Sequence, residues 1–195
     1  MTHDGAVASI CVFCGSSSGN DPRFIEVARS LGAAIATGDH RLVYGGGHVG
    51  LMGVVANAVL EAGGLVTGVM TEQLVAAEVA HLGLTELEVT SSMHARKARM
   101  AELSDGVIVL PGGFGTLDEA FEMITWNQLG LVRVPVVFLD VDGYFDALFE
   151  FIAASVSAEF VSPANAALAR RASTVDEAVE LALTIPDAFT PKWLG

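Results

Sequence analysis

The chain of 195 residues is poor in cationic side chains. Ten lysine and arginine residues stand against 23 aspartate and glutamate residues, which gives a formal net charge of −13 at pH 7. This charge opposes nonspecific binding to nucleic acid or to anionic membranes, so we expect neither as a partner. Lysine occurs only at Lys97 and Lys192, whereas a pyridoxal-phosphate enzyme needs a suitably placed lysine for its Schiff base. We expect no cofactor.

Long apolar runs are missing as well. Although 52% of the residues are hydrophobic, no uninterrupted run reaches the roughly 18 residues that a membrane span needs. We assign the excess to a buried sheet and a subunit interface. The first residues, MTHDGAVASICVFCG, have no basic flank and no apolar signal region, so we expect a cytoplasmic protein.

Residues for redox or metal chemistry are scarce. Cys11 and Cys14 form a C-x-x-C motif, but ASICVFCGSS is typical of a strand, where positions three apart point to opposite faces. Redox motifs of this spacing normally begin a helix, so we expect buried thiols. Glu78 and His81 stand three apart, yet no further histidine or cysteine at ligand spacing completes a metal site. We expect no bound metal.

What the sequence does contain is a regular alternation of apolar, β-rich runs and segments with a helical period. The expected strands cover residues 9–15, 41–47, 65–70, 87–90, 106–113 and 134–143, and the expected helices cover 21–39, 49–64, 92–105, 116–130, 144–156 and 173–183. The strands are continuously apolar, as in sheets that helices cover on both faces. This pattern predicts a doubly wound, mainly parallel α/β sheet. No repeat or linker divides it, so we expect a single domain over residues 1–195.

Three loops rich in glycine or serine directly follow expected strands, namely CGSSSGND, YGGGHVGLMG and PGGFGTLDE. Ligands of such sheets bind beyond the carboxyl ends of the strands, where the direction of the chain around the sheet switches. Small residues there let a ligand approach the backbone. We therefore expect the ligand site among these loops.

The second of these loops contains Gly45, Gly47 and Gly50, which match the dinucleotide pattern G-x-G-x-x-G between a strand and a helix. The pattern usually follows the first strand, and the ribose-binding acid expected about 20 residues later is absent near residues 65–69. Three interpretations stay open: tight packing of strand and helix, NAD binding, or the lining of another nucleotide site.

The third loop is more specific. Gly112, Gly113 and Gly115 permit unusual backbone angles. A helix is expected from about Thr116, and the free N–H groups and positive dipole end of such a helix suit a phosphate. Thr116 and Glu119 also match an ordinary capping box, S/T-x-x-E. Because a cap does not explain three glycines, which cost conformational entropy, we favour a ligand site.

Three of the ten cationic residues, Arg96, Lys97 and Arg99, lie within four positions. On a helix, Arg96 and Lys97 fall in the apolar stripe, whereas Arg99 lies nearer its edge. A charge in such a place is unfavourable unless something opposes it. Arg96 and Lys97 therefore form ion pairs with core carboxylates, extend to solvent, or face an anionic ligand at the neighbouring strand end.

Together these motifs resemble those of a known family. SMHARKARM followed by PGGFGTLDE resembles the paired motifs M-H-x-R-K and P-G-G-x-G-T-x-x-E of the Lonely Guy family, and the likeness runs from about residue 9 to past residue 165. The family consists of cytokinin-activating phosphoribohydrolases, long mislabelled lysine decarboxylases. The resemblance implies a Rossmann-like homodimer that hydrolyses N6-substituted adenosine 5′-monophosphates to the free base and ribose 5-phosphate.

The resemblance also implies the site residues. Arg96 and Glu119 match the catalytic pair. The residues that match substrate contacts are Glu78, Met93, Arg96, Lys97, Gly113, Phe114, Gly115, Thr116, Leu117, Asp118, Glu119 and Thr125. Glu119 would stabilise the positive charge that develops on the ribose, and it would orient or deprotonate the attacking water. Arg96 would stabilise the departing base or the phosphate, since arginine is a poor proton donor.

Two other functions stay open. A general nucleoside 5′-monophosphate nucleosidase would use the same catalytic pair, and no residue tells whether an N6 substituent is required. A non-catalytic carrier of a phosphorylated ligand, similar to the molybdenum-cofactor carriers, would use the same glycine loop. The expected helix that ends at residue 130 carries apolar side chains on more than one face, which favours a homodimer. These side chains are Phe121, Ile124, Trp126 and Leu129.

Overall fold

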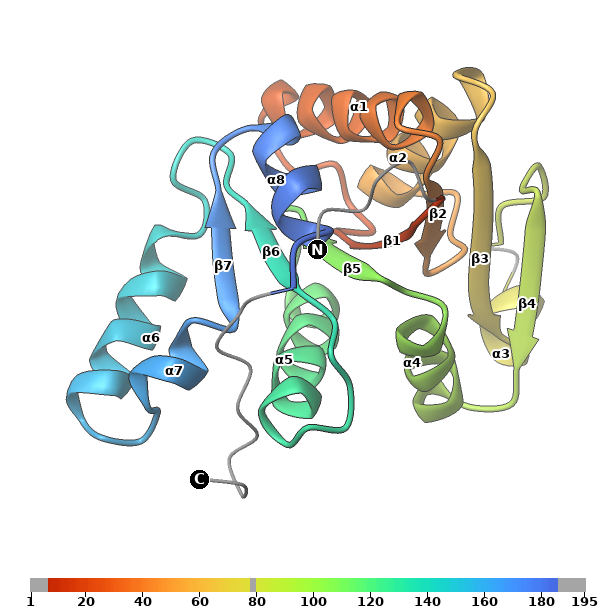
Figure 1. Ribbon diagram of the computed structural model, residues 1–195. Helices are drawn as coiled ribbons and strands as arrows, with labels where there is room; N and C mark the ends of the chain where they lie inside the picture. The colour runs from red at the N-terminus through yellow and green to blue at the C-terminus, as the bar shows by residue number, and fades with distance from the viewer. Residues whose placement is uncertain (1–6, 78–79, 186–195) are drawn as a thin grey trace.

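A computed structural model describes residues 7–77 and 80–185, which form one parallel sheet with helices on both faces (Figure 1). The sheet has seven strands in the order β4-β3-β2-β1-β5-β6-β7, and each neighbouring pair is parallel. The strands are β1 (Ser9–Phe13), β2 (Arg41–Tyr44), β3 (Leu65–Thr71), β4 (Glu86–Thr90), β5 (Gly106–Val109), β6 (Val136–Leu139) and β7 (Ala169–Ala172). The doubly wound, Rossmann-like α/β class expected from the sequence is confirmed.

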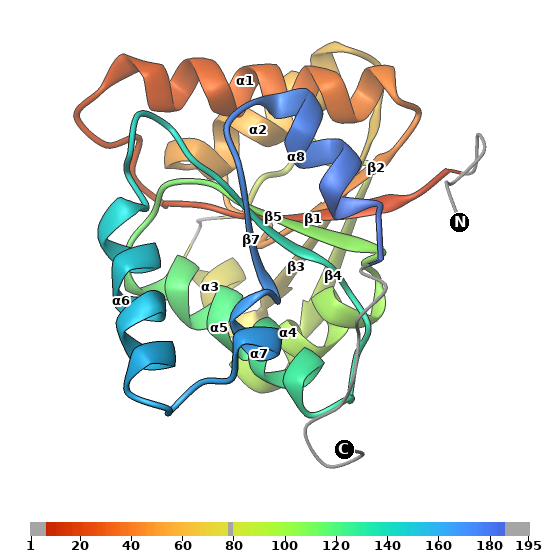
Figure 2. The same cartoon turned by 60° about the vertical axis from the view of Figure 1, so that its left-hand side comes forward.

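The helices lie in two main layers. They are α1 (Pro22–Thr37), α2 (Gly50–Glu61), α3 (Glu72–Ala76), α4 (Met93–Glu102), α5 (Phe114–Gln128), α6 (Asp146–Ser157), α7 (Pro163–Ala166) and α8 (Val175–Ala182). One face of the sheet is covered by α1, α2 and α8, and the other by α4 and α5 (Figure 1, Figure 2). In the described part of the chain, no helix is long and apolar enough to cross a membrane.

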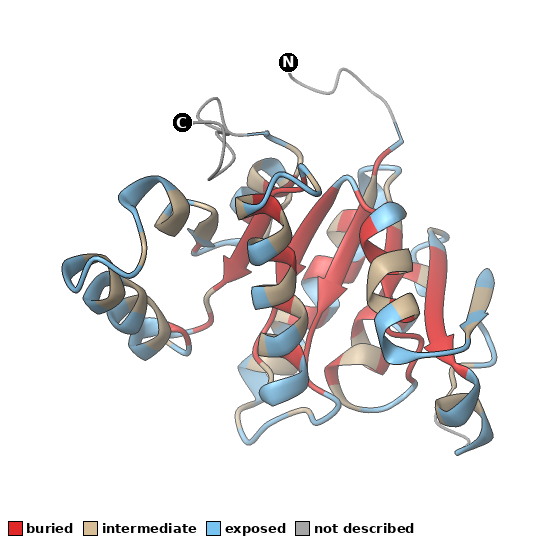
Figure 3. Ribbon diagram, turned by 90° about the horizontal axis from the view of Figure 1, so that it is seen from below, coloured by how far each residue is buried: buried red, intermediate tan, exposed pale blue. Residues whose placement is uncertain are grey.

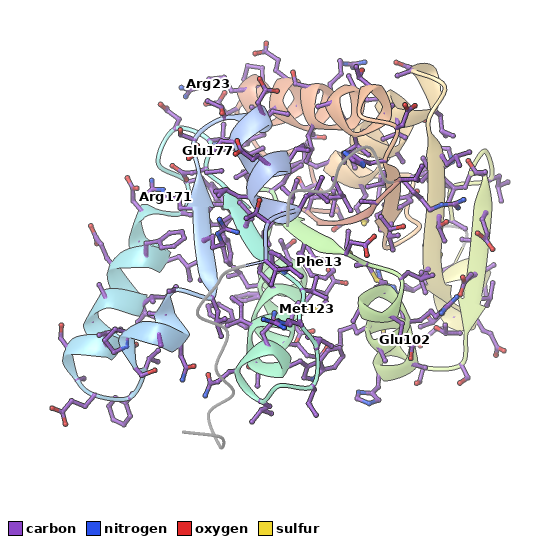
Figure 4. All side chains as sticks on the ribbon, in the orientation of Figure 1. Phe13, Arg23, Glu102, Met123, Arg171 and Glu177 are labelled. Carbon is purple, nitrogen blue, oxygen red and sulfur yellow. The ribbon has the colours of Figure 1, made fainter. Side chains whose placement is uncertain are left out.

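The sheet separates two apolar cores, because successive side chains of a strand point to opposite faces. Val12 of β1 packs among α1, α2 and α8, whereas Cys11 and Phe13 pack toward α4 and α5. Figure 4 labels Phe13 and Met123, which both belong to the second core. In Figure 3 the strands are largely red, and the outward faces of the helices are tan or pale blue. Cys14 belongs to the first core, so the two cysteines are buried free thiols on opposite sides, as expected.

The direction of the chain switches between β1 and β5. From β1 the chain winds outward through β2 and β3 to β4, and it then adds β5 on the other side of β1. Ligands of doubly wound sheets bind at this switch, outside the carboxyl ends of the strands. The loops that follow β1, β2 and β5 all start at that edge, so the fold gathers the three loops selected from the sequence.

Candidate active site

A cavity of about 290 Å³ opens at the carboxyl ends of β1, β2 and β5. Its walls come from the end of β1, from the loops after these strands and from the N-terminal turns of α2, α4 and α5. Eight residues expected in the site line it, namely Met93, Arg96, Gly113, Phe114, Gly115, Thr116, Asp118 and Glu119. The lining is completed by Val12, Cys14, Gly15, Ser16, Gly45 and Met52. The fold thus brings together residues that are far apart in the sequence.

Arg96 of α4 is buried against backbone carbonyl groups, with only 6% of its surface exposed. Its Nε donates to the Val69 carbonyl oxygen at 2.8 Å, and its Nη2 donates to the Gly45 carbonyl oxygen at 3.3 Å. Its Nη1 donates to Glu119 Oε1 at 3.1 Å. These three bonds fix the guanidinium plane. Because a guanidinium carries five N–H donors, others remain for a ligand.

Glu119 of α5 meets Arg96 in the wall of the cavity. Its side chain is 14% exposed, against 8% for that of Arg96. Burial raises the pKa of the Glu119 carboxyl, and the Arg96 guanidinium opposes this shift by favouring the charged form. A buried charge is tolerated when it is paired, so each residue allows the other to lie here. The two residues that the resemblance implies as the catalytic pair are therefore in direct contact.

Lys97 does not line the cavity. Its Nζ donates to Asp118 Oδ2 at 3.0 Å and lies 2.9 Å from Glu122 Oε2. Burial by itself would lower the pKa of Lys97, but the two carboxylates outweigh burial and raise it. The lysine therefore connects α4 to α5. Of the three interpretations that the sequence left open for Lys97, the structure shows the ion pair with carboxylates. A Schiff-base role for Lys97 does not fit this arrangement.

The glycine loop enters α5 two residues earlier than expected. Gly113 is the N-cap, with φ −96°, and the helix begins at Phe114. Thr116 thus lies inside the first turn and is only 4% exposed. The capping box considered for Thr116 and Glu119 is therefore wrong. The first N–H groups of a helix have no intrahelical acceptor, and those of α5 lie at the cavity wall, where they suit an anion.

The three glycines of this loop have different structural reasons. A Cβ on Gly112 would lie 2.1 Å from Thr116 Oγ1 and 2.8 Å from the Gly15 nitrogen, so a side chain does not fit. A Cβ on Gly113 or Gly115 would meet nothing within 4 Å. Close packing explains Gly112, whereas Gly113 and Gly115 leave room beside the cavity for a ligand.

The G-x-G-x-x-G loop after β2 is shaped by two close approaches. A Cβ on Gly45 would lie 2.1 Å from Arg96 Nη2. A Cβ on Gly50, whose φ is +60°, would lie 2.3 Å from the carbonyl carbon of Ser16. Gly45 also lines the cavity. These contacts support close packing and a part in the ligand site, two of the three interpretations that the sequence left open.

A second cavity of about 300 Å³ adjoins the first, and Gly15, Ser16 and Gly113 line both. Phe24 and Tyr144 form part of its wall. The serine-rich loop was selected from the sequence, but these two aromatic residues were not. Tyr144 lies in the short turn after β6. A polar aromatic residue just beyond the carboxyl end of a strand is a signal by which the sequence could have identified Tyr144 as a candidate site residue.

Besides Lys97, three other expected contacts do not line the cavity or fall outside the described residues. Leu117 lies on α5 but does not line the cavity. Thr125 is exposed, its hydroxyl donates to the Phe121 carbonyl oxygen at 2.7 Å, and it lies about 16 Å along the helix axis from Phe114. Glu78 falls outside the residues that the structure describes.

Comparisons with known proteins identify close relatives. A family model described as "Possible lysine decarboxylase" matches residues 52–182. A cytokinin riboside 5'-monophosphate phosphoribohydrolase from Rhodococcoides fascians is 48% identical over 158 residues, which cover 80% of this chain and 80% of that protein. The cytokinin riboside 5'-monophosphate phosphoribohydrolase LOG7 from Arabidopsis thaliana is 49% identical over 154 residues, which cover 79% of this chain and 71% of that protein.

Solved structures share the fold at lower identity. The molybdenum cofactor binding protein from Rippkaea orientalis matches with a TM-score of 0.68 and 25% identity, covering 90% of this chain and 95% of that one. The Moco carrier protein from Chlamydomonas rheinhardtii matches with a TM-score of 0.65 and 23% identity, covering 89% and 94%. The second likeness concerns the fold alone. By its family model and its relatives, the chain belongs to the family of the cytokinin riboside 5'-monophosphate phosphoribohydrolases, whose model carries the lysine decarboxylase description.

Proposed function

We propose that this protein hydrolyses the N-glycosidic bond of N6-substituted adenosine 5′-monophosphates and releases the free base and ribose 5-phosphate. The observation that carries the proposal is the contact between Arg96 and Glu119 in the cavity wall, beside the N-terminus of α5. A carboxylate for the sugar and an anion site for the phosphate thus lie in one place. The similarity to two phosphoribohydrolases supports the same reaction.

Glu119 is the group that acts on the sugar. Cleavage of an N-glycosidic bond builds positive charge on the ribose ring. A carboxylate fixed by Arg96 gains attraction as this charge develops, and it can orient or deprotonate the water that attacks C1′. The C–N bond breaks as the new C–O bond forms, and the departing base takes a proton. The raised pKa of Glu119 makes it a better base than an exposed glutamate.

The 5′-phosphate can be bound without a lysine. The N–H groups at the start of α5 and the open backbone at Gly113 and Gly115 offer donors to an anion. Asp118 also lines the cavity, but its carboxylate accepts a hydrogen bond from Lys97, which weakens its repulsion of a phosphate. The N–H groups of Arg96 that remain free for a ligand would contact the base or the phosphate.

The proposal is tested by comparing kcat/KM for isopentenyl-AMP and for AMP. An apolar pocket gains about 1–3 kcal/mol per added group, so a preference of tens-fold or more for isopentenyl-AMP would support a cytokinin nucleotide as the substrate. Equal values would identify a general nucleoside 5′-monophosphate nucleosidase. The free base and ribose 5-phosphate should appear in equal amounts, because one bond is broken.

A carrier of a phosphorylated ligand is the second candidate function, because the molybdenum cofactor binding protein shares the fold. A carrier needs the glycine loop but no catalytic carboxylate. Incubation with several nucleoside 5′-monophosphates separates the two classes, since the absence of ribose 5-phosphate from every reaction would favour the carrier. An absorbance band from a bound cofactor, with lysine-dependent release of CO₂, would instead support a decarboxylase.

We also propose that the active form is a homodimer, that it acts in the cytoplasm, and that residues 1–195 form one domain. Exposed apolar side chains on and after α5 support the dimer. The location is an expectation from the sequence.

A further inference from the structure

Gly112, where a Cβ would clash with Thr116, is held by a distant loop. The Tyr144 hydroxyl donates to the Gly112 carbonyl oxygen at 2.8 Å, across 32 residues of sequence. On the other side, the Gly15 nitrogen donates to the Pro111 carbonyl oxygen at 3.0 Å. The chain is therefore fixed from two sides immediately before Gly113, where the open part of the loop begins.

The position of the Tyr144 hydroxyl is itself determined by its surroundings. The Tyr144 ring packs edge to face against Phe24 and Phe145, with ring centroids 5.6 Å and 5.0 Å apart. The Asp140 carboxylate accepts hydrogen bonds from the backbone N–H of Gly143 at 3.0 Å and from that of Phe145 at 2.9 Å. These residues flank Tyr144 in the turn between β6 and α6. Although Tyr144 is 44% exposed, its hydroxyl is directed by a fixed turn.

We propose that Tyr144 is a positioning residue that acts through Gly112, fixing the glycine loop in the orientation that binds the 5′-phosphate. The identity of this ligand rests on the proposed function, whereas the ordering of the loop is a property of the chain itself. A loop that must become ordered when the ligand arrives loses affinity, and a preordered loop avoids this loss. Tyr144 does not line the Arg96 cavity, so its hydroxyl should affect binding and not the chemical step.

Tyr144→Phe removes the hydroxyl and keeps the ring. We expect KM for the nucleotide, and the inhibition constant of ribose 5-phosphate, to rise about 3- to 10-fold, which is the range of one hydrogen bond. The value of kcat should stay within about twofold, because the catalytic pair is unchanged. In the unliganded variant, amide hydrogen exchange in a peptide that covers residues 112–116 should become faster.

Tyr44→Phe is the matched control, because it is the same substitution at the other tyrosine of the chain. Tyr44 is fully buried at the end of β2, and its hydroxyl has no hydrogen-bond partner among the described residues. Its loss should leave KM, the inhibition constant and the exchange of the glycine loop unchanged.

Hydrogen exchange and kinetics test the role of Tyr144 and the proposed function independently. If the protein hydrolyses no nucleotide, hydrogen exchange still tests whether Tyr144 orders the loop. Unchanged exchange in Tyr144→Phe overturns the proposal. A lower melting temperature without a change in KM or in the inhibition constant also overturns it, because that result describes stability alone. A fall in kcat at constant KM does so too, since it would place Tyr144 in the chemical step.

Discussion

Among single residues, Glu119 is the side chain on which the proposed reaction depends most. Glu119→Gln keeps the size and most of the hydrogen bonding, but it removes the charge that favours the transition state over the ground state. We expect kcat to fall by roughly 10²-fold or more with little change in KM, because only differential stabilisation accelerates the step. Steady-state kinetics with isopentenyl-AMP measures both constants.

Glu122→Gln is the control for this substitution. Glu122 lies on the same helix, pairs with Lys97 at 2.9 Å and does not line the cavity. The same loss of charge, one turn further along α5, should therefore leave kcat near the wild-type value. Full activity in Glu119→Gln would overturn the mechanism, whatever the substrate.

The raised pKa of Glu119 gives the reaction a pH dependence. Burial raises this pKa above the ordinary value of 4.5, and only the carboxylate form stabilises the developing positive charge. The value of kcat/KM should therefore fall as the pH is lowered, with a midpoint above that of an exposed glutamate. The substrate phosphate also titrates, near a pKa of about 6, so the kinetic midpoint needs an independent assignment.

NMR of the side-chain carboxyl carbons in the unliganded protein provides this assignment, because the Glu119 resonance is the one that Glu119→Gln removes. A Glu119 midpoint above 4.5 agrees with the direction of the shift. A midpoint at or below that value would mean that the attraction of Arg96 outweighs burial.

Among the elements, the loop between β5 and α5 contains glycines with different roles, which alanine substitutions can distinguish. Gly112→Ala would place a Cβ 2.1 Å from Thr116 Oγ1, and it should lower the free energy of unfolding by about 1–3 kcal/mol through overpacking. The Cβ of Gly113→Ala meets nothing within 4 Å, so stability should stay near wild type while KM rises, because the methyl group takes space from the ligand. Denaturant unfolding and steady-state kinetics measure the two effects. Equal losses of stability would contradict the difference.

Most of the elements could be predicted because the sheet determines their pattern. Strands covered on both faces are apolar throughout, so the six expected strands correspond to β1 to β6. The edge strand β7 was missed because its sequence, ARRA, is not an apolar run. Only Ala172 is buried, and the two arginines are partly or fully exposed, as is common at the edge of a sheet. The helices α3 and α7, of five and four residues, are too short to show a hydrophobic period.

The candidate site was predictable only in part. The helical pattern correctly places Arg96 and Lys97 on the inner side of α4, and both contact α5. The partner of each residue depends on how α4 packs against α5, and these two helices are separated in the sequence by β5 and its loop. Arg96 meets Glu119 in the cavity wall, whereas Lys97, which does not line the cavity, meets Asp118. No local pattern distinguishes these neighbouring positions, because the packing between helices is set by the whole fold.

For the whole molecule, apolar side chains that are exposed on α5 and after it support the homodimer that we propose. Phe121 is 36% exposed, Leu129 38% and Leu131 68%. In Figure 3, which views the molecule from the side of α4 and α5, the outward faces of the helices are tan or pale blue. Thr125 lies on the same helix and is exposed, about 16 Å along the axis from Phe114. If Thr125 contacts the nucleotide, as the resemblance implies, we expect it to do so in the cavity of a partner chain.

We therefore expect a homodimer that buries this surface. Light scattering at micromolar concentration should give about twice the chain mass of 20.3 kDa, and the mass of a single chain would contradict the dimer. Leu131→Asp places a charge in the interface and should shift the mass toward one chain. Phe160→Asp is the control, because Phe160 is 87% exposed in the α6–α7 connection, and dissociation by this variant alone would place the interface there. Since Thr125 of a monomer reaches no partner, the Leu131→Asp monomer should also show a raised KM.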